Sequence, residues 1–204
     1  MSANSRLRAP TFTHCGNHLM VHAYDLINTM KLVGYSLADM LPAYPGKDEA
    51  YLDHVWRDTA HASDRFVMPY GLLGTTPCST QYFNVHCGGF RSNGTSQPWP
   101  PDREKINIFC FGGSTTMGYG LEDGDTIPAH LQRNLESAGV KCEVYNFGAG
   151  SYASRHLAMS FLDLVDQGIT PDYAIFLDGL NDSVFGFGHR VLVNLLDGLF
   201  QHEK

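Results

Sequence analysis

A serine that follows two glycines, at the end of an apolar run, is the arrangement in this sequence best suited to chemistry. The stretch "NIFCFGGSTTMGYG" covers residues 107–120, and its first half has the apolar, aromatic character of a buried strand. Glycine tolerates unusual backbone angles and close approach, so Gly112 and Gly113 would allow a tight turn there. Ser114 would then stand exposed between a strand and a helix, where its hydroxyl could act as a nucleophile.

Two further apolar runs end in unusual loops. The loop "NFGAGSYAS" covers residues 146–154, and "DGLND" covers residues 178–182. Ligands of parallel sheets bind beyond the carboxyl ends of the strands. If the strand before Ser114 lies between the other two strands, all three loops meet at one place.

The chemistry that could use these loops is acyl transfer. The backbone N–H of Ser114, a backbone N–H of the second loop and the side-chain amide of Asn181 could hold an oxyanion together. Loss of one such donor costs about 2.7–4 kcal/mol in enzymes where it has been removed. We interpret Asp178 and Asp182 as turn and capping residues rather than as catalytic acids.

Strands that alternate with helices predict the fold around these loops. We expect strands at 106–111, 144–147 and 173–179. A helix should begin at Asp125 or Thr126 and end at Gly139, and another should end at Gly168. The apolar positions that define the second and the last helix are Leu157, Phe161, Leu164 and Val165, and Leu192, Leu195, Leu196 and Leu199. This order is typical of βαβ units in an α/β fold with a parallel sheet.

The three motifs, in this order, resemble those of the SGNH or GDSL-type hydrolase superfamily of esterases, lipases and acyltransferases. "FGGSTTMG", "NFGAGSYAS" and "GLND" are similar to its first, second and third blocks. The resemblance implies a three-layer α/β/α, flavodoxin-like sheet, with Ser114 as the nucleophile and Asn181 as an oxyanion donor. The usual glycine of the second block falls at Ser151, so the backbone donor is assigned to Gly150 or Ser151. A segment further upstream, "PYGLLGTTPCSTQYFNVHCGGFRSN", also resembles a segment that precedes this domain in some members.

This resemblance also implies a reaction and its requirements. The expected function is hydrolysis of a small-molecule or glycan ester through an acyl-enzyme, with acyl transfer as a related activity. No cofactor and no metal are expected.

The base that would activate the serine is not evident. Members of the superfamily carry it in a late Asp-x-x-His block, and no such spacing occurs in the 23 residues (204 − 181) after Asn181. We therefore expect the catalytic Asp and His beyond residue 204, and the hydrolase-like domain to be incomplete. Without its base, the same fold could instead be a binding module for acyl or glycan ligands.

Other histidines are weaker candidates for the base. The pair Asp58 and His61 has the right spacing but lies in the N-terminal region, and His156 has no clear carboxylate partner. His189 and His202 belong to or flank the last expected helix. None of them is assigned as the base.

Two regions are expected along the chain, an N-terminal extension with its linker at 1–104 and the hydrolase-like domain at 105–204. Helical spacing occurs at 19–30 and again at Leu52, Val55 and Trp56, so the extension should be mainly helical. Short strands and turns are expected at 67–90. A linker at 91–105 follows, rich in Pro, Gly, Ser and Asn.

Composition excludes several classes of protein. The 204 residues are 43% hydrophobic and 17% charged, typical of a globular protein with a core. A net charge of −7 argues against nucleic acid as a partner. No apolar run approaches the roughly 18 residues of a membrane span, and no signal peptide is visible, so a cytoplasmic location is expected. Five cysteines without CxxC spacing favour free thiols over a zinc site.

A dinucleotide site is the rival enzyme hypothesis. "GAGSYA" at residues 148–153 fits G-x-G-x-x-A between a strand and a helix, and Asp178 could be the acidic residue that follows. However, that fingerprint normally follows the first strand of its unit. It would also leave the motifs around Ser114 and Asn181 unexplained.

Overall fold

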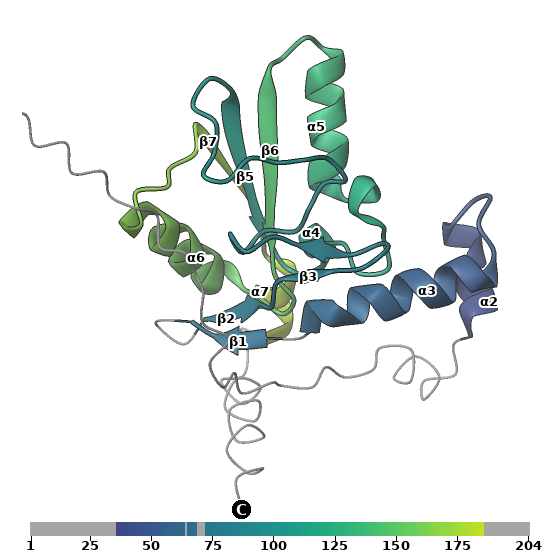
Figure 1. Cartoon of the computed structure of the whole chain (residues 1–204). Helices are drawn as coiled ribbons and strands as arrows, with labels where there is room; N and C mark the ends of the chain where they lie inside the picture. Colours follow the sequence, from purple (N-terminus) through teal and green to yellow (C-terminus); the bar gives the residue numbers. More distant parts are fainter. Residues whose placement is uncertain (1–35, 64, 69–71, 186–204) are drawn as a thin grey trace, which may run out of the picture.

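A three-stranded parallel sheet forms the centre of the protein in the computed structural model, which describes residues 36–63, 65–68 and 72–185 (Figure 1). Its strands are β5 (Ile106–Gly112), β6 (Cys142–Gly148) and β7 (Tyr173–Leu177), in the order β6-β5-β7. In the register of the sheet, Gly112 lies opposite both Gly148 and Leu177. The loops after the three strands therefore start at the same level, with β5 in the middle.

Helices cover both faces of this sheet. Leu131 and Leu135 of α5 (Ile127–Ser137) pack on the face that carries Ile108 and Cys110. Leu157 and Leu164 of α6 (Ser154–Asp166) join the cluster of Phe109 and Phe111. Since successive residues of β5 point to opposite faces, α5 and α6 lie on opposite sides of the sheet. The predicted α/β fold, with helices on both sides of a parallel sheet, is confirmed.

The ends of α5 and α6 follow from their sequences. The Thr126 hydroxyl caps α5 by accepting a hydrogen bond from the Ala129 N–H at 3.3 Å, and Pro128 occupies the first turn. Gly139 and Gly168, which follow the two helices, have φ angles of 81° and 77°. Both expected stop positions are thus glycines in the left-handed conformation.

The described part of the N-terminal extension is helical only up to Ser63. The helix α3 (Glu49–Ala60) buries Leu52, Val55 and Trp56, as their spacing predicts. The other elements of the extension are α2 (Leu37–Met40), η1 (Leu41–Ala43), η2 (His61–Ser63), β1 (Arg65–Val67), β2 (Leu73–Thr75), β3 (Cys78–Ser79) and β4 (Asn84–Val85). Strands β1 and β2 form one antiparallel pair, and β3 and β4 form another.

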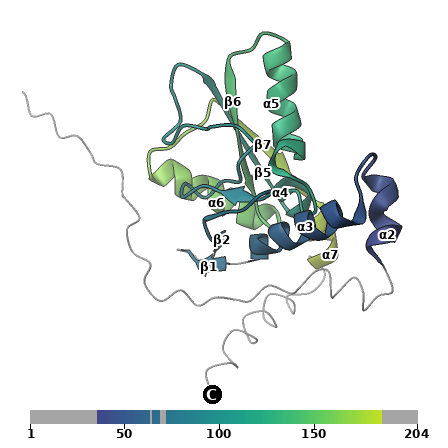
Figure 2. The ribbon, with the colours of Figure 1, turned by 45° about the vertical axis from the view of Figure 1, so that its right-hand side comes forward.

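The extension shares its core with the sheet. Phe90, which is buried, packs its ring against Tyr145 at 5.0 Å and Phe147 at 5.8 Å between centroids. Both views place α3 and the β1–β2 pair at the end of the sheet where α4 (Ser114–Met117) and α7 (Leu180–Phe185) lie (Figure 2). The extension therefore packs against the end of the sheet at which the three loops meet.

The segment 91–105 has little regular structure, as its composition predicts, but it is not a solvated spacer. Arg91 and Asn93 are buried, and Trp99 packs against the cluster of Phe90 and Phe109. The division at residue 104 into an extension and a domain stays a prediction.

Some expected features lie outside the described residues, namely the helical spacing at 19–30, the helix of Leu192–Leu199, and His189 and His202. Cys110 and Cys142 are buried free thiols, as expected, and burial raises the pKa of Cys110 to about 12. In the described ranges, no helix has the length and apolar character needed to cross a membrane.

A substitution in the extension should destabilise the whole protein if the core is shared. We expect Phe90→Ala to lower the free energy of unfolding by about 3–5 kcal/mol. The control Val67→Ala changes an apolar side chain of the same extension that is 61% exposed, and should stay within about 0.5 kcal/mol of the wild type. Urea unfolding followed by circular dichroism and by tryptophan fluorescence checks this. Two separate transitions in the wild type would contradict a shared core.

Candidate active site

Ser114 is the first residue of α4, a single-turn helix directly after the central strand β5. The Met117 N–H donates to the Gly113 carbonyl at 3.0 Å, and the Gly118 N–H donates to the Ser114 carbonyl at 2.9 Å. Gly118 ends the helix with a φ of 84°. The structure therefore places Ser114 at the strand-to-helix turn expected from the sequence.

The two glycines before Ser114 are required for a different reason from the one expected. Gly113 has an extended backbone (φ −82°, ψ −154°), which does not need glycine. Instead, an added Cβ at Gly113 would lie 2.6 Å from Asn181 Nδ2, and one at Gly112 would overlap the Thr116 hydroxyl. Close packing by the protein itself, rather than unusual backbone angles, thus excludes side chains here.

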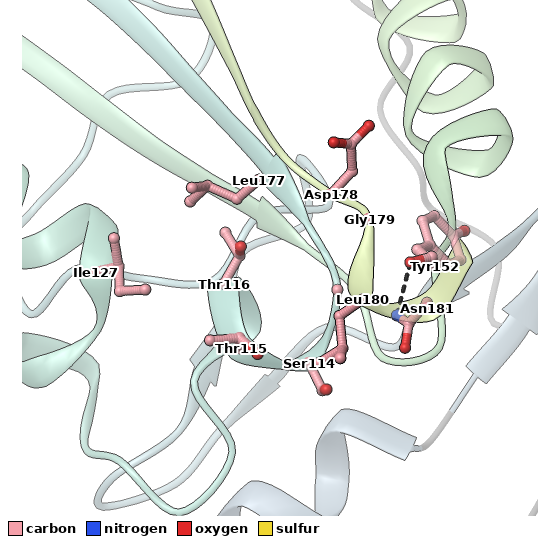
Figure 3. A pocket seen from close by; sticks show the side chains of 11 residues that line it. Ser114, Thr115, Thr116, Ile127, Tyr152, Leu177, Asp178, Gly179, Leu180 and Asn181 are labelled. Atoms are coloured by element: carbon pink, nitrogen blue, oxygen red, sulfur yellow. Dashed lines mark hydrogen bonds between the residues drawn. The ribbon is translucent and has the colours of Figure 1, made fainter. Parts of the chain in front are cut away.

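Asn181 joins the second and third loops beside these glycines. Its Nδ2 donates to the Tyr152 carbonyl at 2.7 Å (Figure 3). A primary amide has two N–H donors, so this contact uses one of them and fixes the orientation of the group. Asn181 is the second residue of α7, which begins shortly after β7 ends at Leu177.

A pocket of about 210 Å³ lies at this junction. Both Ser114 and Asn181 line it, together with Gly113, Thr115, Thr116, Ile127, Tyr152, Leu177, Asp178, Gly179 and Leu180 (Figure 3). The structure thus brings together two of the four residues predicted for the site. Gly150 and Ser151 are not among the lining residues, although Tyr152 from the same loop is.

The second loop is held by the extension. Arg65 Nη2 donates to the Gly150 carbonyl at 3.2 Å, and an added Cβ at Gly150 would lie 2.7 Å from the same nitrogen. The Tyr152 hydroxyl accepts a hydrogen bond from the Leu73 N–H at 3.1 Å and donates to the Leu73 carbonyl at 3.0 Å. Because a trans peptide holds its carbonyl and N–H in opposite directions, Arg65 directs the Ser151 N–H away from itself.

The acidic residues of the third loop cap α6. The Ser154 N–H donates to Asp182 Oδ2 at 3.0 Å, and the Ser154 hydroxyl lies 2.7 Å from Asp178 Oδ2 and 2.9 Å from Asp182 Oδ2. Hydrogen bonds from the Ser154 N–H and hydroxyl lower the pKa of Asp182. These contacts agree with the interpretation of Asp178 and Asp182 as capping residues.

No histidine in the described ranges lines the pocket. His156 lies in the first turn of α6, where its Nδ1 accepts from the Ala153 N–H at 3.1 Å and its ring stacks on Tyr152. Burial lowers its pKa, so the ring is neutral at pH 7. His61 is the exposed residue that follows α3, and Asp58 Oδ2 accepts a hydrogen bond from the Tyr82 N–H at 2.9 Å. Neither His156 nor the pair of Asp58 and His61 provides a base for Ser114.

Several pocket residues have no role assigned from the sequence. Thr116 is buried, and its hydroxyl has no hydrogen-bond partner among the described residues. Ile127, Leu177 and Leu180 form an apolar rim and are 46%, 42% and 66% exposed. Leu177 precedes the third motif and Leu180 lies within it, but no signal in the sequence brings Ile127, the first residue of α5, to the same pocket.

Comparisons with known proteins give similarity to solved structures of an esterase. No family model and no curated protein matches the chain. Among solved structures, it is similar to AlinE4, an SGNH-hydrolase family esterase, with 28% identity, coverage of 50% of this chain and 57% of that one, and a TM-score of 0.38. An aspartate-to-alanine variant of that esterase matches at 28% identity, 50% and 54% coverage and a TM-score of 0.38. A serine-to-alanine variant matches at 27%, with the same coverage and a TM-score of 0.37. The chain spans about half the length of these esterases.

The backbone of the second loop generates a stability prediction. Ser151 has a φ of 62°, which costs an L-residue roughly 1–2 kcal/mol and glycine very little. After the greater entropy loss of glycine is subtracted, Ser151→Gly should raise the free energy of unfolding by about 0.5–1 kcal/mol. The matched control Ser160→Gly, inside α6, should lower it by about 0.5 kcal/mol. Urea unfolding measures the free energy of unfolding of both variants. If Ser151→Gly destabilises the protein, the backbone at Ser151 is not strained.

The Asp182 cap generates a prediction about pH. Its folded-state pKa lies below the ordinary value of 3.8, so its contribution to stability is present above pH 4 and is lost as the pH falls through the folded pKa. Asp182→Ala should therefore be less stable than the wild type at pH 7, and the difference should shrink towards pH 3. Denaturant unfolding at both pH values checks this. A difference independent of pH would show that the carboxylate charge is not responsible.

Proposed function

We propose that the protein is an ester hydrolase in which Ser114 is the nucleophile. One observation carries this proposal: Ser114 and Asn181, from the loops after β5 and β7, line the same pocket at the carboxyl end of the sheet. A hydroxyl beside an oriented amide donor is the pairing that acyl transfer requires. The resemblance of the three loop motifs to SGNH hydrolases supports the same assignment.

In the proposed reaction, Ser114 Oγ attacks the carbonyl carbon of the ester and transfers its proton to a base. The oxygen of the tetrahedral intermediate accepts hydrogen bonds from the Ser114 N–H, from the N–H of Gly150 or Ser151, and from the Asn181 amide. Collapse of the intermediate releases the alcohol, which takes up the proton, and leaves an acyl-enzyme. Water then repeats the sequence, so that a carboxylic acid leaves and the serine is restored.

We assign the base to a residue outside the described part of the chain. His156 holds the Ala153 N–H with Nδ1 and does not line the pocket. A serine hydroxyl without a base remains protonated and is a weak nucleophile. We therefore expect the proposed activity only when the base is present beside Ser114.

The size and lining of the pocket favour small acyl groups. The volume is about 210 Å³, and Ile127, Leu177 and Leu180 provide apolar contacts beside Ser114. We propose short-chain esters of small molecules or glycans as the substrate class. An acetyl group is the simplest member of this class.

The glycines of the second loop argue against the dinucleotide hypothesis. In a dinucleotide fold, such glycines leave space for the pyrophosphate to approach the backbone. Here an added Cβ at Gly148 would collide with the Met117 backbone, and one at Gly150 would meet Arg65 and Tyr119. The space beside both glycines is filled by the protein itself.

The proposed function predicts the effect of two substitutions on p-nitrophenyl acetate hydrolysis by the full-length gene product. Ser114→Ala should reduce the rate by about 10³-fold or more, because the nucleophile is lost. Asn181→Ala should reduce kcat by about 10²–10³-fold, because one oxyanion donor is lost. The matched control Asn134→Ala, an exposed residue of α5, should leave the rate unchanged.

An unchanged rate in Ser114→Ala would rule out this serine as the nucleophile. A second candidate is a binding module, because no histidine within the described ranges lines the pocket beside Ser114. A fluorophosphonate probe separates the two candidates. Labelling that disappears in Ser114→Ala supports the hydrolase, whereas a folded full-length protein that is never labelled supports the binding module.

A further inference from the structure

The helix that carries Ser114 is too short to be stable alone. It has a single turn, and isolated helices shorter than about 12 residues are marginal even with good helix formers. The carbonyls at the end of a helix have no partner within it. For α4 these include the carbonyls of Thr116 and Met117. The carbonyl of the C-cap residue Gly118 follows them and also accepts a hydrogen bond from the Leu121 N–H at 3.2 Å.

Arg91 supplies donors for two of these carbonyls. Its Nη1 donates to the Met117 carbonyl at 2.7 Å and to the Gly118 carbonyl at 2.6 Å. Its Nη2 donates to the carbonyls of Tyr82 at 3.2 Å and Leu121 at 2.6 Å. The side chain is fully buried, so the planar guanidinium with its fixed fork of donors acts without competition from water.

Asn146 supplies the donor for the third carbonyl. Its Nδ2 donates to the Thr116 carbonyl at 2.9 Å, and its Oδ1 accepts from the Gly148 N–H at 2.9 Å. The Arg91 N–H in turn donates to the Asn146 carbonyl at 2.8 Å. Arg91 and Asn146 are therefore linked, and together they bind the carbonyls of the last two residues of α4 and of its C-cap residue Gly118.

The charge of Arg91 suits this position as well. A cation near a helix C-terminus is favourable because the carbonyl end carries partial negative charge. Asp123 Oδ1 accepts from Arg91 Nε at 2.9 Å, and Asp123 Oδ2 accepts from Asn84 Nδ2 at 2.7 Å. Burial raises the pKa of Asp123, and the Arg91 charge opposes this rise. Each N–H group of the Arg91 guanidinium thus has an acceptor, and its positive charge is paired with the Asp123 carboxylate.

We propose that Arg91 is a positioning residue that fixes α4 and thereby holds the hydroxyl and N–H of Ser114 towards the pocket. Arg91 does not line the pocket and acts only through the carbonyls of Met117 and Gly118. Its importance for catalysis rests on the function proposed above. Its hold on α4 does not depend on that function.

Hydrogen exchange of single amides tests this hold in the full chain. Arg91→Lys keeps the charge but loses the fork of donors. We expect the amides of Met117 and Gly118 to exchange at least about tenfold faster than in the wild type, relative to sheet amides such as that of Phe109. Equal acceleration of α4 and sheet amides would overturn the proposal, because Arg91 would then support only global stability.

Two further variants keep the test decisive. Glu143→Gln changes a buried carboxylate that pairs with Lys105 at 2.6 Å, near the start of β6, and should not speed exchange in α4 selectively. If Arg91→Lys does not fold, Asn146→Ala removes the neutral contact to the Thr116 carbonyl and should loosen the same two amides selectively. Unchanged α4 exchange in Asn146→Ala would also overturn the proposal.

Kinetics separates this inference from the proposed function. In Arg91→Lys, kcat for p-nitrophenyl acetate should fall by about 10–100-fold with KM nearly unchanged, because a misplaced nucleophile affects the transition state more than binding. If the wild type is active, and Arg91→Lys speeds exchange in α4 selectively but leaves kcat unchanged, the catalytic part of the proposal is refuted. An inactive wild type would refute the proposed function and leave the exchange result standing.

Discussion

Parallel pairing of β5 with β6 on one side and β7 on the other is the constraint on which the candidate site depends. Gly112 lies opposite Gly148 and Leu177, so three loops begin at one level. Ser114 follows the central strand and Asn181 follows an outer one, and the direct pairing of β5 with β7 makes them neighbours. A strand order that placed another strand between β5 and β7 would leave the same motifs intact in the sequence and separate Ser114 from Asn181 in space.

The sheet and its helices could be predicted because their patterns are local. Continuous apolar runs and stop signals such as Gly139 and Gly168 are visible within short windows of sequence. The meeting of Ser114 and Asn181 could also be anticipated, because topology limits where the carboxyl ends of parallel strands lie. What could not be predicted depends on long-range contacts. Arg91 in a polar, glycine-rich stretch resembles a surface residue, yet it is buried beneath α4.

The packing around individual glycines also depends on long-range contacts and could not be predicted from the sequence. A glycine in a sequence indicates that a side chain is excluded, but it does not say by what. For Gly113 the excluding group is the Asn181 amide, and for Gly150 it is the Arg65 guanidinium, 85 residues earlier in the chain. Ser151 shows the converse, since a left-handed backbone is occupied by a residue that is not glycine. Such details follow from tertiary packing and have no local signature.

The contrast between the packed floor of the pocket and its exposed rim has a consequence for how the site could diversify. An added Cβ at Gly112 would overlap the Thr116 hydroxyl, and one at Gly113 would lie 2.6 Å from Asn181 Nδ2. Ile127, Leu177 and Leu180 instead project from three different elements with much of their surface free. Under the proposed function, mutation at the rim alone would therefore change substrate preference, and combinatorial libraries restricted to these three positions would explore new substrates without changing Ser114 or Asn181.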